Sequence, residues 1–118
     1  MTDIQRVQVS QRYSEIAVHN GVVYLAGQVP EATVNDSVYA QTKEVLGLID
    51  QLLEQVNSDK SRILTAQVFL AEMQDYAEMN RAWDEWVAEK NAPPRACVEA
   101  KLAQSSWKVE IVVVAAQR

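Results

Sequence analysis

Two short runs of this chain are apolar at consecutive positions, and they restrict the fold more than any other feature. The runs are Val22–Ala26 and Ile111–Ala116. Because side chains alternate between the two faces of a strand, such runs predict strands that are covered on both faces. The chain offers only two amphipathic helices, which suffice for one face of a sheet. We therefore expect a second copy of the same sheet to cover the other face, and hence a homo-oligomer.

The periodicity of apolar residues predicts the order of the elements. Short strands are expected over 4–9, 14–18 and 22–27, a long helix over 37–56, a strand over 62–70, a second helix from Asp75 to about Lys90, and strands over 95–101 and 107–116. Asn35 or Asp36 is available to cap the first helix, and Asp75 with Glu78 forms a capping-box pattern for the second. The order βββαβαββ predicts an α+β fold, a mixed sheet with both helices on one face, in a single domain over 1–118.

Charge and composition exclude several classes of function. The net charge of −5 and pI near 4.8, with scattered basic residues, argue against a nucleic-acid surface. No run approaches the roughly 18 apolar residues of a membrane span. The single cysteine, Cys97, fits a reducing compartment, so we expect a cytoplasmic protein. The single histidine, His19, precedes an Asn-Gly hairpin turn, and neither a histidine metal site nor a Ser-His triad is expected.

Arg95 follows Pro93–Pro94, which should stop the preceding helix and begin a strand. A guanidinium at a strand entrance is suited to clamp a carboxylate, although it can also be a solvated charge at the strand end. Close to the core it needs a partner, for which Glu99, Glu110 and a ligand are the candidates. Glu110 lies between Val109 and Ile111, either as an edge-strand charge that limits aggregation or as a carboxylate that moves a proton.

Three further side chains are candidates with more than one interpretation. Cys97 should point the same way as Arg95, as a small apolar residue more often than a nucleophile, because no histidine is near it in sequence. Asn80 borders the apolar stripe of the second helix and can bond to a loop or a ligand. Tyr13 precedes a strand and either covers the sheet edge or lines a pocket.

Four short motifs occur in a specific order and spacing: Gly27-Gln28-Val29-Pro30, Met79-Asn80, Pro94-Arg95-Ala96-Cys97-Val98-Glu99 and Lys108-Val109-Glu110-Ile111. Together they resemble the Rid family of reactive intermediate deaminases, also called YjgF-like proteins, over essentially the whole chain. The resemblance implies a chorismate-mutase-like fold that forms a homotrimer, with the sheets packed into a central barrel and three clefts between subunits.

The resemblance also implies an activity, the hydrolysis of 2-imino or 2-enamino acids to 2-keto acids and ammonia without a cofactor or metal. By this likeness Arg95 would bind the substrate carboxylate, the Cys97 backbone would contact the substrate nitrogen or water, and Glu110 would orient the attacking water. The other residues implied at the cleft are Ala26, Gly27, Asn80 and Tyr13, the last from the adjacent subunit.

The chain departs from the family pattern at Ala26, where family deaminases commonly carry a serine. It also reads Gln11–Arg12 and Leu102–Ala103 where the family has Gly-Pro and Leu-Pro. Loss of the hydroxyl at position 26 removes a hydrogen bond worth about 1 kcal/mol in a dry pocket. Two alternatives to the deaminase therefore stay open: a non-catalytic binder or sensor of small carboxylates, and an endoribonuclease, against which the acidic surface counts.

Overall fold

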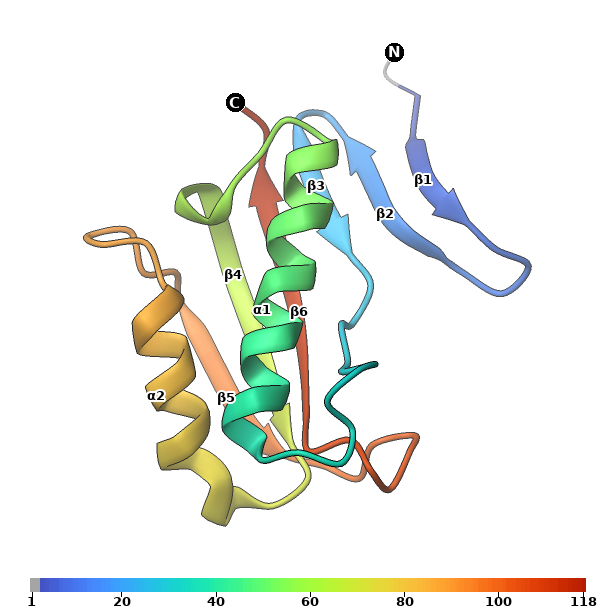
Figure 1. The fold of residues 1–118 in the computed structure, drawn as a ribbon. Helices are drawn as coiled ribbons and strands as arrows, with labels where there is room; N and C mark the ends of the chain where they lie inside the picture. Colours follow the sequence, from blue (N-terminus) through green and yellow to red (C-terminus); the bar gives the residue numbers. More distant parts are fainter. Residues whose placement is uncertain (1–2) are drawn as a thin grey trace.

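The computed structural model describes residues 3–118 as one six-stranded sheet with two helices in front of it (Figure 1). The elements are β1 (Gln5–Val9), β2 (Ser14–His19), β3 (Val22–Leu25), α1 (Val38–Gln55), β4 (Ile63–Leu70), α2 (Tyr76–Trp86), β5 (Arg95–Glu99) and β6 (Val109–Ala116). The strand order is β1-β2-β3-β6-β4-β5, in which only β4 and β5 are parallel neighbours. The expected element order, the α+β class and the mixed sheet are confirmed.

The helix ends differ from the sequence prediction. Ser37, rather than Asn35 or Asp36, caps α1, because its Oγ accepts a hydrogen bond from the Ala40 N–H at 3.2 Å. Asp75 makes no capping hydrogen bond to α2. The predicted capping box is therefore wrong, and α2 ends at Trp86, short of the expected Lys90.

The core lies between the helices and one face of the sheet, which we call the helix face. In β6 the burial alternates strictly, and Val109, Ile111 and Val113 point into the core. Ala66 and Val68 of β4 do the same, and both pair with β6 residues on that face. The alternation follows from the two-residue period of a strand.

The opposite face of the sheet, which we call the open face, has no helix over it within residues 3–118 (Figure 1). Strand register places Ala17, Tyr24, Val114, Val112, Phe69 and Val98 on it. Tyr24 is 48% exposed and Val98 43% exposed. Thr65, Gln67 and Glu110 lie on the open face as well, so its side chains are mainly, not entirely, apolar. The prediction that both helices cover one face of the sheet is confirmed (Figure 1).

The β2–β3 hairpin has the predicted Asn-Gly turn. Asn20 and Gly21 adopt positive φ angles of 53° and 76°, the geometry that matches the twist of the flanking strands. His19 is the last residue of β2 and pairs with Val22, so it flanks the turn. Neither α1 nor α2 is long and apolar enough to cross a membrane.

Candidate functional site

Arg95 begins the edge strand β5 and points toward α2. It pairs with Ala66, which is buried on the helix face. Its guanidinium lies 5.0 Å from the centre of the Trp83 ring, and its Nη2 donates a hydrogen bond to Tyr76 Oη at 3.4 Å. Its Nη1 approaches Met79 Sδ at 3.9 Å. The side chain is therefore half-buried and held by aromatic and sulfur contacts of one helix.

Neither candidate carboxylate within the chain neutralises Arg95. Glu99 accepts a hydrogen bond from the Met73 N–H at 2.8 Å, and the ion pairs of residues 3–118 do not include Arg95. A half-buried charge without a counter-charge is costly, since desolvation is not offset. The remaining candidate partner of this guanidinium is an anion from outside the chain.

Cys97 and Asn80 lie on the same side of the sheet as Arg95. Cys97 pairs with Val68 and packs against the core. Burial raises the pKa of its thiol, and the neighbouring Arg95 lowers that pKa by less, so the thiolate is disfavoured. Asn80 is half-buried, and helical spacing places it between Tyr76 and Trp83 on α2. Its side chain makes no hydrogen bond within residues 3–118.

Glu110 lies directly beside Gly27. A β-carbon at Gly27 would overlap the Glu110 carboxylate, so the carboxylate can lie in this position only because residue 27 has no side chain, and a larger residue there would displace it. The neighbouring residues Gln28 and Ile111 exchange two backbone hydrogen bonds, of 2.9 and 3.1 Å, which fix the contact. Burial raises the pKa of Glu110. A raised pKa makes a carboxylate a better proton acceptor than an ordinary glutamate is, which suits it to proton transfer.

The two charged candidates do not meet within one chain. Arg95 lies on the helix face, whereas Glu110 pairs with Phe69 on the open face. Glu110, one of the expected partners of Arg95, would have to lie on a neighbouring strand to pair with it; this expectation is wrong, because β4 lies between β5 and β6. Strands are spaced about 4.8 Å apart, so β5 and β6 are separated by about 10 Å as well as by the sheet itself.

Ala26 and Tyr13 belong to the other half of the sheet. Ala26 directly precedes Gly27, and its N–H donates to the Glu15 carbonyl at 2.9 Å. Tyr13 is 56% exposed in the connection between β1 and β2. Four strand spacings, roughly 20 Å, separate β2 from β5, so Tyr13 is remote from Arg95 of its own chain. Arg95, Cys97 and Asn80 thus form one group and Glu110, Gly27 and Ala26 a second, and Tyr13 is remote from the first.

A family model described as Endoribonuclease L-PSP matches residues 3–117, almost the whole chain. The chain belongs to the L-PSP family. A RutC family protein of Haemophilus influenzae is 61% identical over 112 residues, which cover 95% of this chain and 97% of that protein. The RutC family protein YoaB of Escherichia coli is 43% identical over 113 residues, 96% of this chain and 97% of that protein.

Solved structures of L-PSP family relatives have the same fold. A YjgF family protein from Neisseria meningitidis superimposes with a TM-score of 0.95 at 46% identity, covering 98% of this chain and 96% of that one. YyfA from Yersinia pestis, described as a Rid family protein, gives a TM-score of 0.84 at 27% identity, covering 92% and 90%. The resemblance to the Rid and YjgF proteins, and with it the chorismate-mutase-like fold, is confirmed.

Two polar side chains of α1 were missed by the sequence reasoning. Gln41 is completely buried, and the Glu44 carboxylate accepts hydrogen bonds from the segment that follows Gly27. A signal existed for the first of them, because Gln41 stands between Val38 and Val45 at the spacing of the apolar stripe. A buried glutamine in such a stripe needs hydrogen-bond partners, and this need indicates that other segments of the chain pack against it.

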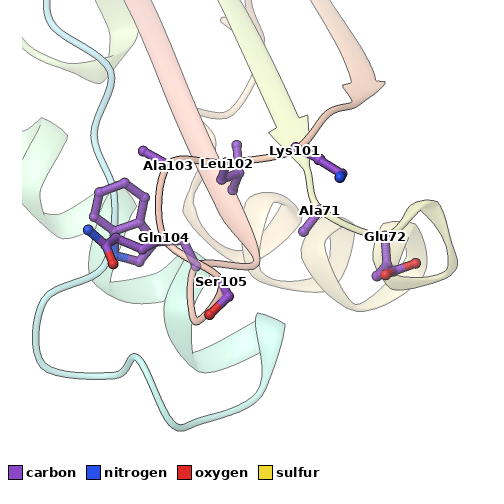
Figure 2. A pocket seen from close by; sticks show the side chains of 8 residues that line it. Ala71, Glu72, Lys101, Leu102, Ala103, Gln104 and Ser105 are labelled. Carbon is purple, nitrogen blue, oxygen red and sulfur yellow. The ribbon is translucent and has the colours of Figure 1, made fainter.

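A pocket of about 460 Å³ lies at the end of the sheet near the β5–β6 connection. Figure 2 shows its lining of Ala71, Glu72, Lys101, Leu102, Ala103, Gln104 and Ser105, with Trp107 as the eighth residue. None of the predicted site residues lines it. Within residues 3–118 no group of three histidine, cysteine or acidic side chains is arranged to hold a metal ion.

Proposed function

We propose that this L-PSP family chain forms a homotrimer whose clefts, between subunits, hydrolyse reactive 2-imino or 2-enamino acids to 2-keto acids and ammonia. One subunit would supply Arg95, Cys97 and Asn80. The next would supply Glu110, Gly27 and Ala26, with Tyr13 closing the cleft. The opposite faces occupied by Arg95 and Glu110 support this division, since one chain cannot bring them together. The apolar open face supports the oligomer.

The half-buried Arg95 guanidinium without a carboxylate partner carries the proposal. A planar guanidinium binds a carboxylate through two parallel hydrogen bonds, so a small organic acid matches it better than a neutral ligand does. The Tyr76 and Trp83 contacts hold the guanidinium in place before the ligand arrives. Little ordering free energy is then lost on binding.

The reaction makes modest demands on such a cleft. A protonated imine carbon is electrophilic, and water adds to it while a carboxylate takes the proton of that water. The resulting carbinolamine loses ammonia when its nitrogen is protonated and its hydroxyl proton leaves, which yields the keto acid. Glu110, with a pKa raised by burial, is suited to take the first proton and return it to the nitrogen. Cys97 would contribute its backbone, since its thiol favours the neutral form.

An ammonia-release assay on imines generated by an amino-acid oxidase tests the activity. We expect Arg95→Ala to lower kcat/KM at least about a hundredfold, because a buried charge-assisted pair is lost. Arg81→Ala is the matched control, since Arg81 also stacks on an aromatic ring, that of Tyr39, but already pairs with Glu78. Equal rates in wild type and Arg95→Ala would rule out the catalytic role of Arg95.

Ala26 favours a second candidate, a protein that binds small carboxylates without turnover. A pocket without the serine hydroxyl has one fewer group to orient water. Calorimetry with 2-ketobutyrate would reveal binding that depends on Arg95 in either case. Binding with no ammonia release from any imine would favour this candidate over the enzyme.

The family description names a third candidate, an endoribonuclease. The net charge of −5 disfavours binding to a polyanion. RNA cleavage by the wild type that disappears in both Arg95→Ala and Glu110→Gln would support it. Cleavage that persists unchanged in both variants would indicate a contaminating nuclease.

A further inference from the structure

The Glu44 side chain binds the backbone of the segment that follows Gly27. Its two oxygens accept hydrogen bonds from the N–H groups of Glu31, Ala32 and Thr33, each at 3.0 Å, and from Thr33 Oγ1 at 2.6 Å. Burial would raise the pKa of Glu44, but the bonds from Ala32, Thr33 and Glu31 outweigh it and lower that pKa. The ionised carboxylate therefore anchors this segment to α1.

Gln41, one helical turn earlier, binds segments on two sides. Its Nε2 donates to the carbonyl of Val34 at 3.3 Å, that of Asp36 at 3.5 Å and that of Ser106 at 3.0 Å. Its Oε1 accepts from the Lys108 N–H at 2.8 Å. Because Gln41 is completely buried, its amide atoms cannot exchange these partners for bulk water, so loss of the bonds as a set is costly.

The two anchored segments lead directly to the contact between Gly27 and Glu110. The first starts at residue 31, just after the Gly27–Pro30 motif, and the second ends at Lys108, two residues before Glu110. Gln28, which precedes the first segment, and Ile111, which follows the second, are paired through their backbones. Side chains three residues apart on a helix lie on one side of it, so one turn of α1 binds both segments.

We propose that Gln41 and Glu44 are positioning residues, which hold these two segments so that the backbone at Gly27 stays close against the Glu110 carboxylate. Gly27 has no side chain whose packing could fix its position. The position of its backbone therefore depends on the hydrogen bonds that hold the neighbouring segments. A loosened segment would admit water to the carboxylate. The catalytic consequence rests on the proposed function, but the positioning itself is measurable without any substrate.

The test compares three variants by hydrogen exchange and by NMR titration of the Glu110 carboxyl carbon. Glu44→Gln keeps the shape of the side chain but turns an amide NH₂ toward backbone N–H donors, and Gln41→Met removes all the hydrogen bonds at nearly constant volume. Glu54→Gln is the control, because Glu54 is an exposed acid of α1 whose side chain makes no hydrogen bond within residues 3–118.

In Glu44→Gln and Gln41→Met we expect the amides of Gln28 and Ile111 to exchange at least about tenfold faster, as a local opening does, with the rest of β4 and β6 unchanged. The Glu110 carboxyl should titrate closer to its ordinary pKa as water reaches it. Glu54→Gln should match the wild type in both measurements. If Gln41→Met does not fold, Glu44→Gln alone decides the result.

Uniformly faster exchange throughout the sheet, with the titration of Glu110 unchanged, would show that Gln41 and Glu44 only stabilise the fold in general. That result would overturn the proposal. Unchanged exchange at Gln28 and Ile111 in Glu44→Gln would overturn it as well. In the enzyme, kcat should fall in both variants while the affinity for 2-ketobutyrate, which depends on Arg95, stays within about twofold of wild type. A wild-type protein without imine hydrolysis would refute the proposed function alone, and the exchange and titration results would still decide the positioning.

Discussion

Glu110 occupies a central strand, because β6 lies between β3 and β4. The interpretation of this residue as a charge that protects a sheet edge is therefore wrong. Its carboxylate lies against the backbone of Gly27, and burial raises its pKa. A group that prefers its protonated form in the folded state makes folding less favourable as it ionises.

Glu110→Gln should change the pH dependence of stability. In the range from the ordinary glutamate pKa up to the raised one, the folded wild type binds more protons than the unfolded chain, so its stability falls as the pH rises. Glutamine cannot ionise, and the variant should gain stability relative to wild type through that range. Urea denaturation at pH values below and above it measures the difference. A constant difference at all pH values would contradict a raised pKa.

Helices α1 and α2 are also joined by polar contacts that a hydrophobic pattern does not reveal. Trp86 Nε1 donates to Asp50 Oδ2 at 3.0 Å, and Tyr39 Oη donates to Glu85 Oε1 at 2.5 Å. Both pairs link residues far apart in the sequence. The apolar periodicity predicted which face of each helix is buried, but these partners depend on how the helices lie against each other.

A double-mutant cycle tests the contact of Trp86 with Asp50. Trp86→Phe and Asp50→Ala should each destabilise the fold, and the double variant should lose less than their sum by about 1 kcal/mol, the worth of one hydrogen bond. Thermal or urea denaturation supplies the four free energies. Pairing Trp86→Phe with Glu54→Ala, a change in the exposed acid one turn along α1, should give additive losses. If the losses of Trp86→Phe and Asp50→Ala were also additive, the hydrogen bond between Trp86 and Asp50 would be contradicted.

At the level of the molecule, the groups around Arg95 and Glu110 are on opposite sides of one sheet. The open face, with Tyr24 and Val98 exposed, is suited to pack against another copy. In the proposed clefts, one subunit supplies Arg95 and its neighbour supplies Glu110. An oligomer of Arg95→Ala chains or of Glu110→Gln chains is then inactive, but an oligomer that mixes the two has a cleft in which both residues are intact.

Co-refolding Arg95→Ala with Glu110→Gln should therefore restore imine hydrolysis that neither variant has by itself. The ammonia assay on the mixture and on the separate variants measures the gain. Mixing Arg95→Ala with the double variant is the control, because no cleft in that mixture contains Arg95. A mixture no more active than its separate components would contradict a cleft shared between subunits.

The element order, the apolar open face and the motif residues were predictable, because each depends on local periodicity or on short motifs that a strand or helix keeps together. Gly27 and Glu110 belong to motifs far apart in the chain, and the sequence grouped them only through the family resemblance. Their contact, and the anchoring of both segments by Gln41 and Glu44, depend on which strands become neighbours.

Strand order was the feature that local patterns could not supply. The sequence alone predicted the two helices, the two strands that are apolar at consecutive positions, an arginine at the start of one strand and a glutamate within another. The tertiary structure decided that β4 lies between β5 and β6 and that the register turns Arg95 and Glu110 to opposite faces. The physical reason is that pairing between distant strands is selected by how the whole sheet packs under the helices, which a two-residue period does not encode.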